Sequence, residues 1–272
     1  MKAASRPGRQ RYMRHCHGLR RQLPLAVILL AWVVAVGISD DQSEDIRKTY
    51  ERGWYLLSQI HVDKSGLDEA IRLYSEVLES VPEDRDIYWK LSEMTFKKAE
   101  AQGNDEENRE IYERALAYAK TARDRHPDSV EAHFWVGCCS AKIAEIIGNI
   151  RASLIVNQAI RELELTIRLA PQHRFAVTGA VILAAIYTDS PWPLKNLRKA
   201  ERYGLDAIGK DPNLTLASVK LAKVYAQQKN FDRAREEALR CLGTTEPTYI
   251  WDAVLYNWPE AESLLKEIDR SR

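Results

Sequence analysis

The stretch from Trp54 to Pro82, WYLLSQIHVDKSGLDEAIRLYSEVLESVP, decides the fold. Its apolar residues recur at spacings of three and four, which is the period of an amphipathic helix and not of a strand. Pro82 marks the end of the second helical segment, because proline cannot continue a helix. We therefore expect two successive helices here, and the same periodicity continues along the chain from Ser43 onward.

The pattern repeats. Prolines end helical segments at five places, 35 to 45 residues apart: Pro82, Pro127, Pro171, Pro212 and Pro247. An alanine stands twelve residues before each of the first four prolines and thirteen before the fifth: Ala70, Ala115, Ala159, Ala200 and Ala234. Small residues in one register mark places where two helices approach closely, so five helix pairs account for nearly all of residues 46–247.

These units resemble tetratricopeptide repeats, which are helix–turn–helix units of 34 residues. The resemblance implies an all-α solenoid over residues 43–272. The middle three units are longer, with extra residues expected between their two helices at Glu100–Asn108, Gly148–Ser153 and Thr188–Pro193. After the fifth pair we expect two capping segments, Ile250–Trp258 and Pro259–Ile268, with Trp251 and Trp258 on one face.

Composition and charge exclude several classes of protein. Lys+Arg number 40 against 39 Asp+Glu, and seven of the basic residues lie in residues 1–22, where no acid occurs. The rest of the chain carries a net charge of −6, so we expect no nucleic-acid partner. Neither a catalytic constellation nor a metal-ligand spacing appears, so we expect no enzyme, no cofactor and no metal. The cysteines of the repeat region, Cys138, Cys139 and Cys241, are expected to be buried small hydrophobes.

Residues 1–37 have the form of an export signal. A basic segment is followed by an apolar run of about 14 to 16 residues and then by small residues at Ala35 and Gly37. We expect either cleavage after Gly37, which gives a periplasmic protein, or retention of residues 23–38 as an inner-membrane anchor. A mitochondrial presequence is a third possibility.

A narrower resemblance covers about residues 45–270. The helix AHFWVGCCSAKIAEIIG (132–148) and the loop Thr188–Pro193 are similar to those of the T-component (TatT) family of TRAP transporters, which are periplasmic tetratricopeptide proteins. This resemblance implies an accessory role in organic-acid uptake. The expected partners are the substrate-binding protein or the membrane subunits, with a small organic-acid or hydrophobic ligand and a homo-oligomer as further expectations.

A second interpretation is a general scaffold for protein–protein assembly in the envelope or at a membrane. The segment from Trp135 to Gly148 also resembles the corresponding helix of the regulators of microtubule dynamics, which are animal tetratricopeptide proteins. An enclosed apolar pocket in the third and fourth units would favour the ligand-binding function. A long open groove of mixed polarity would favour the scaffold.

Six residues are candidates for binding a ligand or a partner. Five follow the longest first helix and its insertion: Trp135, Lys142, Glu145, Asn149 and Arg151. Tryptophan supplies apolar area and the cations attract a carboxylate. The alternatives are that Trp135 packs between repeats and that Lys142 and Glu145 form an exposed i,i+3 pair. The sixth is Trp192, between two prolines, which either latches its loop onto the next repeat or projects toward a partner.

Overall fold

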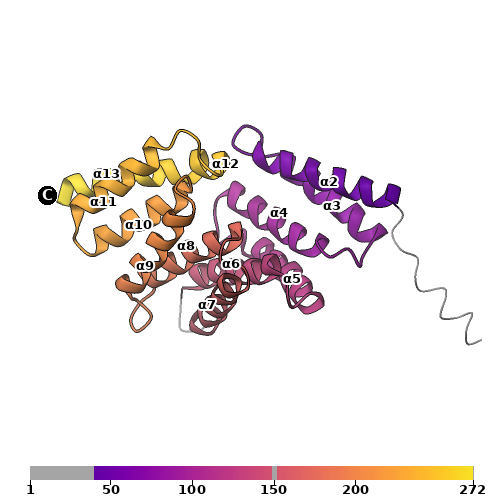
Figure 1. Cartoon of the computed structure of the whole chain (residues 1–272), viewed down its shortest axis with the longest axis horizontal. Helices are drawn as coiled ribbons and strands as arrows, with labels where there is room; N and C mark the ends of the chain where they lie inside the picture. Colours follow the sequence, from indigo (N-terminus) through magenta and orange to yellow (C-terminus); the bar gives the residue numbers. More distant parts are fainter. Residues whose placement is uncertain (1–39, 149–151, 272) are drawn as a thin grey trace, which may run out of the picture. The chain divides into compact units, whose positions relative to one another are not determined.

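The computed structural model describes residues 40–148 and 152–271, and Figure 1 shows them as a succession of helices. The predicted signal or anchor, residues 1–37, lies outside the described residues. Within the described part of the chain no strand is present, and no helix is both long and apolar enough to cross a membrane. Residues Glu44–Arg272 form one compact unit.

Five antiparallel helix pairs make up this unit, which confirms the all-α solenoid. The pairs are α2 (Asp40–Ser58) with α3 (Gly66–Ser80), α4 (Ile87–Gln102) with α5 (Arg109–Arg125), α6 (Val130–Ile147) with α7 (Ala152–Leu169), α8 (Arg174–Asp189) with α9 (Leu197–Lys210), and α10 (Thr215–Gln227) with α11 (Phe231–Gly243). Three more elements follow the pairs: α12 (Ile250–Asp252), the π-helical turn η1 (Ala253–Asn257) and α13 (Trp258–Ser271).

Local sequence signals set the ends of these helices. Helices α3, α5, α7 and α9 each end two residues before a repeat proline. At the other ends, side chains satisfy free backbone N–H groups: Ser129 Oγ accepts from Ala132 N at 3.1 Å, and Asn196 Oδ1 accepts from Lys199 N at 3.0 Å. Such caps stabilise a helix by about 1 kcal/mol each.

The repeated small residues lie where the two helices of a pair meet, as predicted. Their members are fully buried: Ala70, Ala115, Ala159, Ala200 and Ala234. Gly137 on α6 is one position of close approach, because a Cβ there would stand 2.6 Å from Cγ of Leu163 on α7. Only glycine therefore lets α6 and α7 keep this separation.

The extra residues of the middle units lie between the two helices of a pair. Gly103–Asn108 joins α4 to α5, and Asn108 Nδ2 holds this loop by donating to Ala99 O at 3.2 Å. The loop Ser190–Asn196 joins α8 to α9, where Asn196 N donates to Tyr187 O at 2.8 Å. Both insertions are therefore confirmed in place, while the third includes residues 149–151, outside the described part.

Two hydrophobic clusters form the core, and the two cap tryptophans belong to different ones. Trp251 is 5% exposed and packs into the cluster of α2, α3 and α4, whereas Trp258 packs against the larger cluster of the remaining helices. The prediction that they share one face was wrong. The wider π-helical turn η1 lies between them and changes the angular spacing that a continuous α-helix would give.

The three described cysteines are free thiols. Cys139 and Cys241 are buried, as predicted, and Cys138 is half-buried. Burial raises the pKa of Cys139 and of Cys241 to about 12. These thiols are therefore packing groups and weak nucleophiles at neutral pH.

Candidate functional site

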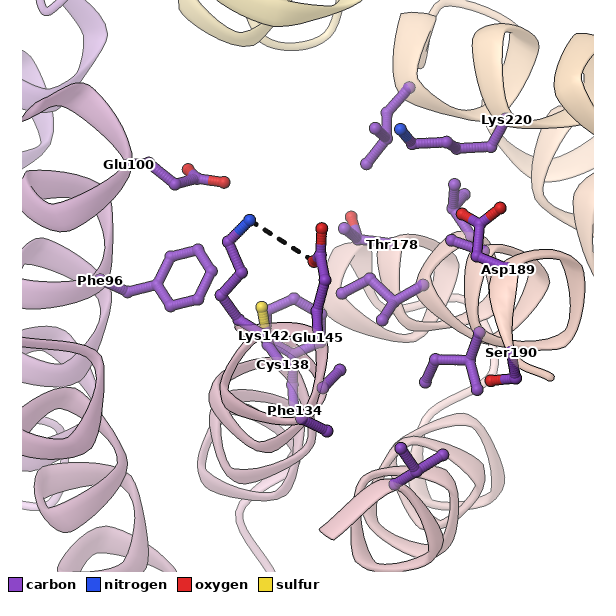
Figure 2. Close-up of a pocket in the computed structure, with 18 of the residues that line it drawn as sticks. Phe96, Glu100, Phe134, Cys138, Lys142, Glu145, Thr178, Asp189, Ser190 and Lys220 are labelled. Carbon is purple, nitrogen blue, oxygen red and sulfur yellow. Dashed lines mark hydrogen bonds and ion pairs between the residues drawn. The ribbon is translucent and has the colours of Figure 1, made fainter. Parts of the chain in front are cut away.

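The first helices of four successive pairs line one cavity of about 1370 Å³. Side chains of α4, α6, α8 and α10 face it, and the start of α7 together with the C-terminal segment from Tyr249 to Glu260 complete its wall. Figure 2 shows Phe96 and Glu100 of α4 across the cavity from Asp189 of α8 and Lys220 of α10, with the α6 side chains between them. The solenoid repeat brings these residues together, because each first helix occupies the equivalent place in its pair.

An aromatic cluster forms the apolar part of this wall. The rings of Phe134 and Phe175 stack with centroids 4.5 Å apart, and Trp135 lies 5.5 Å from Phe96 and 5.8 Å from Phe175. Trp135 is only 3% exposed. The packing role considered for Trp135 is thus what the structure shows, and its ring supports the cavity wall from within the core.

Lys142 is ion-paired on both sides. Its Nζ lies 3.4 Å from Glu145 Oε2, which is the predicted i,i+3 pair, and 2.6 Å from Asp105 Oδ2 in the α4–α5 loop. Burial alone would lower the pKa of Lys142, but the carboxylates of Asp105 and Glu145 outweigh it and the pKa is raised. Sequence reasoning missed Asp105, because it lies on a different helix pair.

The other lysines that line the cavity are paired in the same way. Lys220 lies 2.7 Å from Glu260, Lys223 lies 2.9 Å from Asp189, and Lys97 lies 2.9 Å from both Glu100 and Asp252. A free carboxylate would have to displace one of these partners to reach a lysine, and breaking a partly buried ion pair is costly. The cavity lysines therefore offer no unpaired charge to an anionic occupant.

Two further charged residues of the wall, Arg174 and Glu93, were also not singled out from the sequence. The Arg174 guanidinium lies over the rings of Trp54, at 4.8 Å, and of Phe175, at 4.2 Å. Glu93 is buried on α4; burial raises its pKa, against the opposing charges of Arg174, Lys90 and Lys97. Glu93 stands in a stretch of α4, Leu91–Phe96, that is buried throughout but contains Ser92 and Thr95, so the sequence alone does not mark it as unusual.

The remaining candidates fall at the edge of the cavity or outside the described residues. Trp192 lines the cavity mouth and is 88% exposed, so it does not latch its loop onto the next repeat. Asn149 and Arg151 lie outside the described residues. In the described part of the chain no group of His, Cys, Asp and Glu side chains is arranged to hold a metal ion.

Comparison with solved structures establishes the fold class. A thermophilic tetratricopeptide-repeat protein of Thermus thermophilus superimposes with a TM-score of 0.59 over 79% of this chain and 99% of that chain, at 16% sequence identity. The chain has a tetratricopeptide-type repeat fold. At this level of identity the likeness concerns architecture alone.

Comparison of sequences points to one group of proteins. The family model of the regulators of microtubule dynamics 1-3 matches residues 55–176. The regulator of microtubule dynamics protein 1 of Bos taurus is 27% identical over 158 residues, which is 57% of this chain and 47% of that protein. The Pongo abelii protein of the same name is 28% identical over 120 residues, 43% of this chain and 38% of that protein.

This chain spans less than half the length of either curated relative. The matched residues run from α2 to the start of α8 and include the segment Trp135–Gly148, whose likeness to these regulators is visible in the sequence. The comparisons thus support the regulators of microtubule dynamics, and not the T-component family, as the group that this chain resembles. The loop that carries Trp192 lies outside the matched range.

Proposed function

We propose that this chain is a non-enzymatic scaffold that binds a segment of a partner protein in the cavity formed by its first helices. The observation that carries the proposal is the cavity itself, whose wall is drawn from four successive helix pairs. Solenoids of this kind offer such a shared surface to extended partners. At about 1370 Å³ the cavity exceeds the ~300–1,000 Å³ typical of sites for drug-sized ligands, so it has room for a polypeptide segment.

The comparisons favour this scaffold over a transporter accessory, since the matching family and both curated relatives are named as regulators of microtubule dynamics. A role of that kind requires assembly with proteins and no catalytic group. The export or anchoring of residues 1–37 remains part of the proposal, and the anchored form would hold the repeat unit beside a membrane. Fractionation of cells that express the full chain tests that placement.

A second candidate function is that of a TRAP-type accessory that holds a small ligand. The aromatic side chains of Phe96, Phe134 and Phe175 in the cavity wall favour it. Since the cavity lysines are already paired, an organic-acid ligand of such an accessory would have to displace one of their carboxylate partners or bind Arg174, which also lines the cavity.

The experiment uses the full chain with a photo-crosslinking amino acid in place of Val156, which lines the cavity. The matched control carries the same group in place of Ala117, an exposed residue of α5 that is not part of the cavity wall. After irradiation in cells, mass spectrometry identifies the crosslinked species. Light scattering on the purified chain measures self-association in parallel.

A polypeptide crosslinked at position 156 and absent at position 117 supports the scaffold. A small molecule at position 156, together with co-purification of a TRAP substrate-binding or membrane subunit, supports the accessory function instead. Equal crosslinking at both positions would show that the cavity is not the binding surface.

A further inference from the structure

The C-terminal segment Tyr249–Tyr256, which we call the strap, reaches from the fifth helix pair to the first two pairs. Trp251 of the strap packs edge-on against Trp54 of α2, with ring centroids 5.5 Å apart. It is buried in the same cluster as Leu57, and Leu255 packs against that cluster as well. The first helix pairs therefore already hold a short helical segment, supplied by the chain itself.

The polar side of this contact is a buried ion pair. Asp252 Oδ1 lies 2.9 Å from Lys97 Nζ, and the side chains of both residues are mostly buried. Burial alone would lower the pKa of Lys97, but the carboxylates of Asp252 and Glu100 raise it well above its ordinary value. The site thus selects an acidic side chain directly after the aromatic one.

A third contact comes from Tyr249. Its ring lies 5.2 Å from that of Trp251, and burial raises its pKa against the opposing charge of Arg174. Arg174 also lies over the ring of Trp54. Arg174 and Trp54 therefore both border the start of the strap. We call the receiving residues, Trp54, Leu57, Lys97 and Arg174, the strap site.

The strap is fixed at its two ends and not through a long helix of its own. Before it, Thr248 N donates to Asn213 O at 3.1 Å. After it, Asn257 Nδ2 donates to Thr215 Oγ1 at 2.9 Å, and Trp258 Nε1 donates to Cys241 O at 3.0 Å. Within the strap, α12 has three residues and the rest is the π-helical turn. Local opening between the two fixed ends leaves α13 in place, because α13 packs in the larger cluster.

From these contacts we propose that the strap site is a docking site for a partner segment, and that the strap occupies it as an intramolecular competitor. The partner segment is a short helix in which an aromatic residue is followed directly by an acidic one, as in Trp251-Asp252. This inference rests on the proposed scaffold function and narrows it to a class of partner. A partner segment binds the strap site only when it displaces the strap. The strap therefore lowers the apparent affinity of the partner for the site.

The test supplies the sequence of the strap as a separate peptide. A fluorescent peptide with the sequence of residues 248–257, TYIWDAVLYN, is titrated into the full chain and its anisotropy is followed. A tethered competitor acts at an effective concentration of up to the millimolar range. We therefore expect the Trp251→Ala chain to bind the peptide at least about 10-fold more tightly than the wild-type chain does. The matched control is Leu205→Ala, which removes an exposed side chain of α9 outside the cavity wall and should bind as the wild type does.

Charge exchange tests the specificity of the site. A peptide with lysine in place of its aspartate should bind the Trp251→Ala chain about 10-fold or more weakly than the parent peptide, because it meets Lys97 instead of pairing with it. Adding Lys97→Glu to that chain should reverse the preference. Circular dichroism confirms that each variant is folded, and Asp252→Asn serves as a milder release of the strap if Trp251→Ala unfolds.

Equal affinity of the peptide for the wild-type and strap-released chains, or no binding to either, overturns the proposal. Loss of preference without the expected reversal on Lys97→Glu also contradicts the acidic requirement. These results are independent of crosslinking at position 156. If a partner is crosslinked at position 156 but the chain does not bind the peptide, the scaffold function is supported. Only the proposal of the strap site is then rejected.

Discussion

His133 of α6 and Glu162 of α7 are joined by a hydrogen bond of 2.6 Å between Nδ1 and Oε2. The other ring nitrogen of His133 lies 2.9 Å from the carbonyl oxygen of Pro127, and Arg123 of α5 reaches the same glutamate at 3.0 Å. This network ties the second helix pair to the third. It raises the pKa of His133, first through the bond to Glu162 and against the effect of burial.

The first prediction concerns pH. Because the folded-state pKa of His133 is raised, its contribution to stability is fully present below the unfolded value of about 6.5 and is lost as pH rises through the folded value. Burial would raise the pKa of Glu162, but His133 and Arg123 outweigh it and the pKa is lowered. The contribution of Glu162 is therefore present above about 4.3 and is lost as pH falls.

Thermal unfolding of wild type and His133→Asn across this range checks the sign. We expect the difference in Tm to be largest between about pH 4.3 and 6.5 and to shrink above that window. Glu162→Gln is the control background, because it removes the carboxylate that raises the pKa of His133, and there the effect of His133→Asn should lose this profile. A difference in Tm for His133→Asn that stays constant with pH would contradict the prediction.

A second prediction concerns the close approach of α6 and α7. Gly137→Ala places a Cβ 2.6 Å from Leu163 Cγ and 3.3 Å from Ala159 O. Overpacking of this kind costs about 1–3 kcal/mol, which exceeds the gain of ~1 kcal/mol in helix propensity. We expect a net loss of up to about 2 kcal/mol in the free energy of unfolding, measured with urea.

The matched control for that substitution is Gly209→Ala on α9. No atom lies within 4 Å of the Cβ that it adds. The propensity gain then acts alone, and we expect a stabilisation of about 0.5–1 kcal/mol. If both variants shift in the same direction, the packing argument for Gly137 fails.

A third prediction addresses the contact between Trp54 and Trp251. Trp251→Ala removes a buried indole and should cost about 3–5 kcal/mol of stability, while Trp54→Ala should cost less because Trp54 is 41% exposed. The two rings meet edge-on, so a double-mutant cycle should give a coupling energy of about 0.5–1.5 kcal/mol. Additive single effects would show that the two rings do not interact in solution.

The fourth prediction concerns Trp192. Because its side chain is 88% exposed, Trp192→Ala should change the free energy of unfolding by less than about 0.5 kcal/mol. At the cavity mouth an exposed tryptophan is a typical anchor for a partner, so crosslinking at position 156 should fall. Val62→Ala, which removes an exposed side chain outside the cavity wall, is the control for both measurements. Unchanged crosslinking in Trp192→Ala would exclude a role in binding.

Much of the fold follows from local features of the sequence. The helices were predictable because their period, caps and terminal prolines are encoded within a few residues of each other, as at Ser129 and Pro127. Their pairing was predictable because small residues such as Ala159 recur in one register and permit close approach. The candidate site was predictable in part: Trp135, Lys142 and Glu145 do lie on the cavity wall, on the helix expected to carry them.

The rest depended on contacts between residues far apart in the chain. Three contacting pairs could not be identified from their separation in the sequence: Asp105 with Lys142, Asp252 with Lys97, and Trp251 with Trp54. Each pair is brought together by the stacking of the helix pairs. One π-helical turn also redirected Trp251 away from Trp258. The helices and their pairing could thus be derived from the order of the residues, because both are governed by local backbone and packing preferences. Only the tertiary structure decided the partners of the buried charges and the contact between the strap and the first helix pair. Both depend on the cumulative geometry of every repeat between the contacting residues.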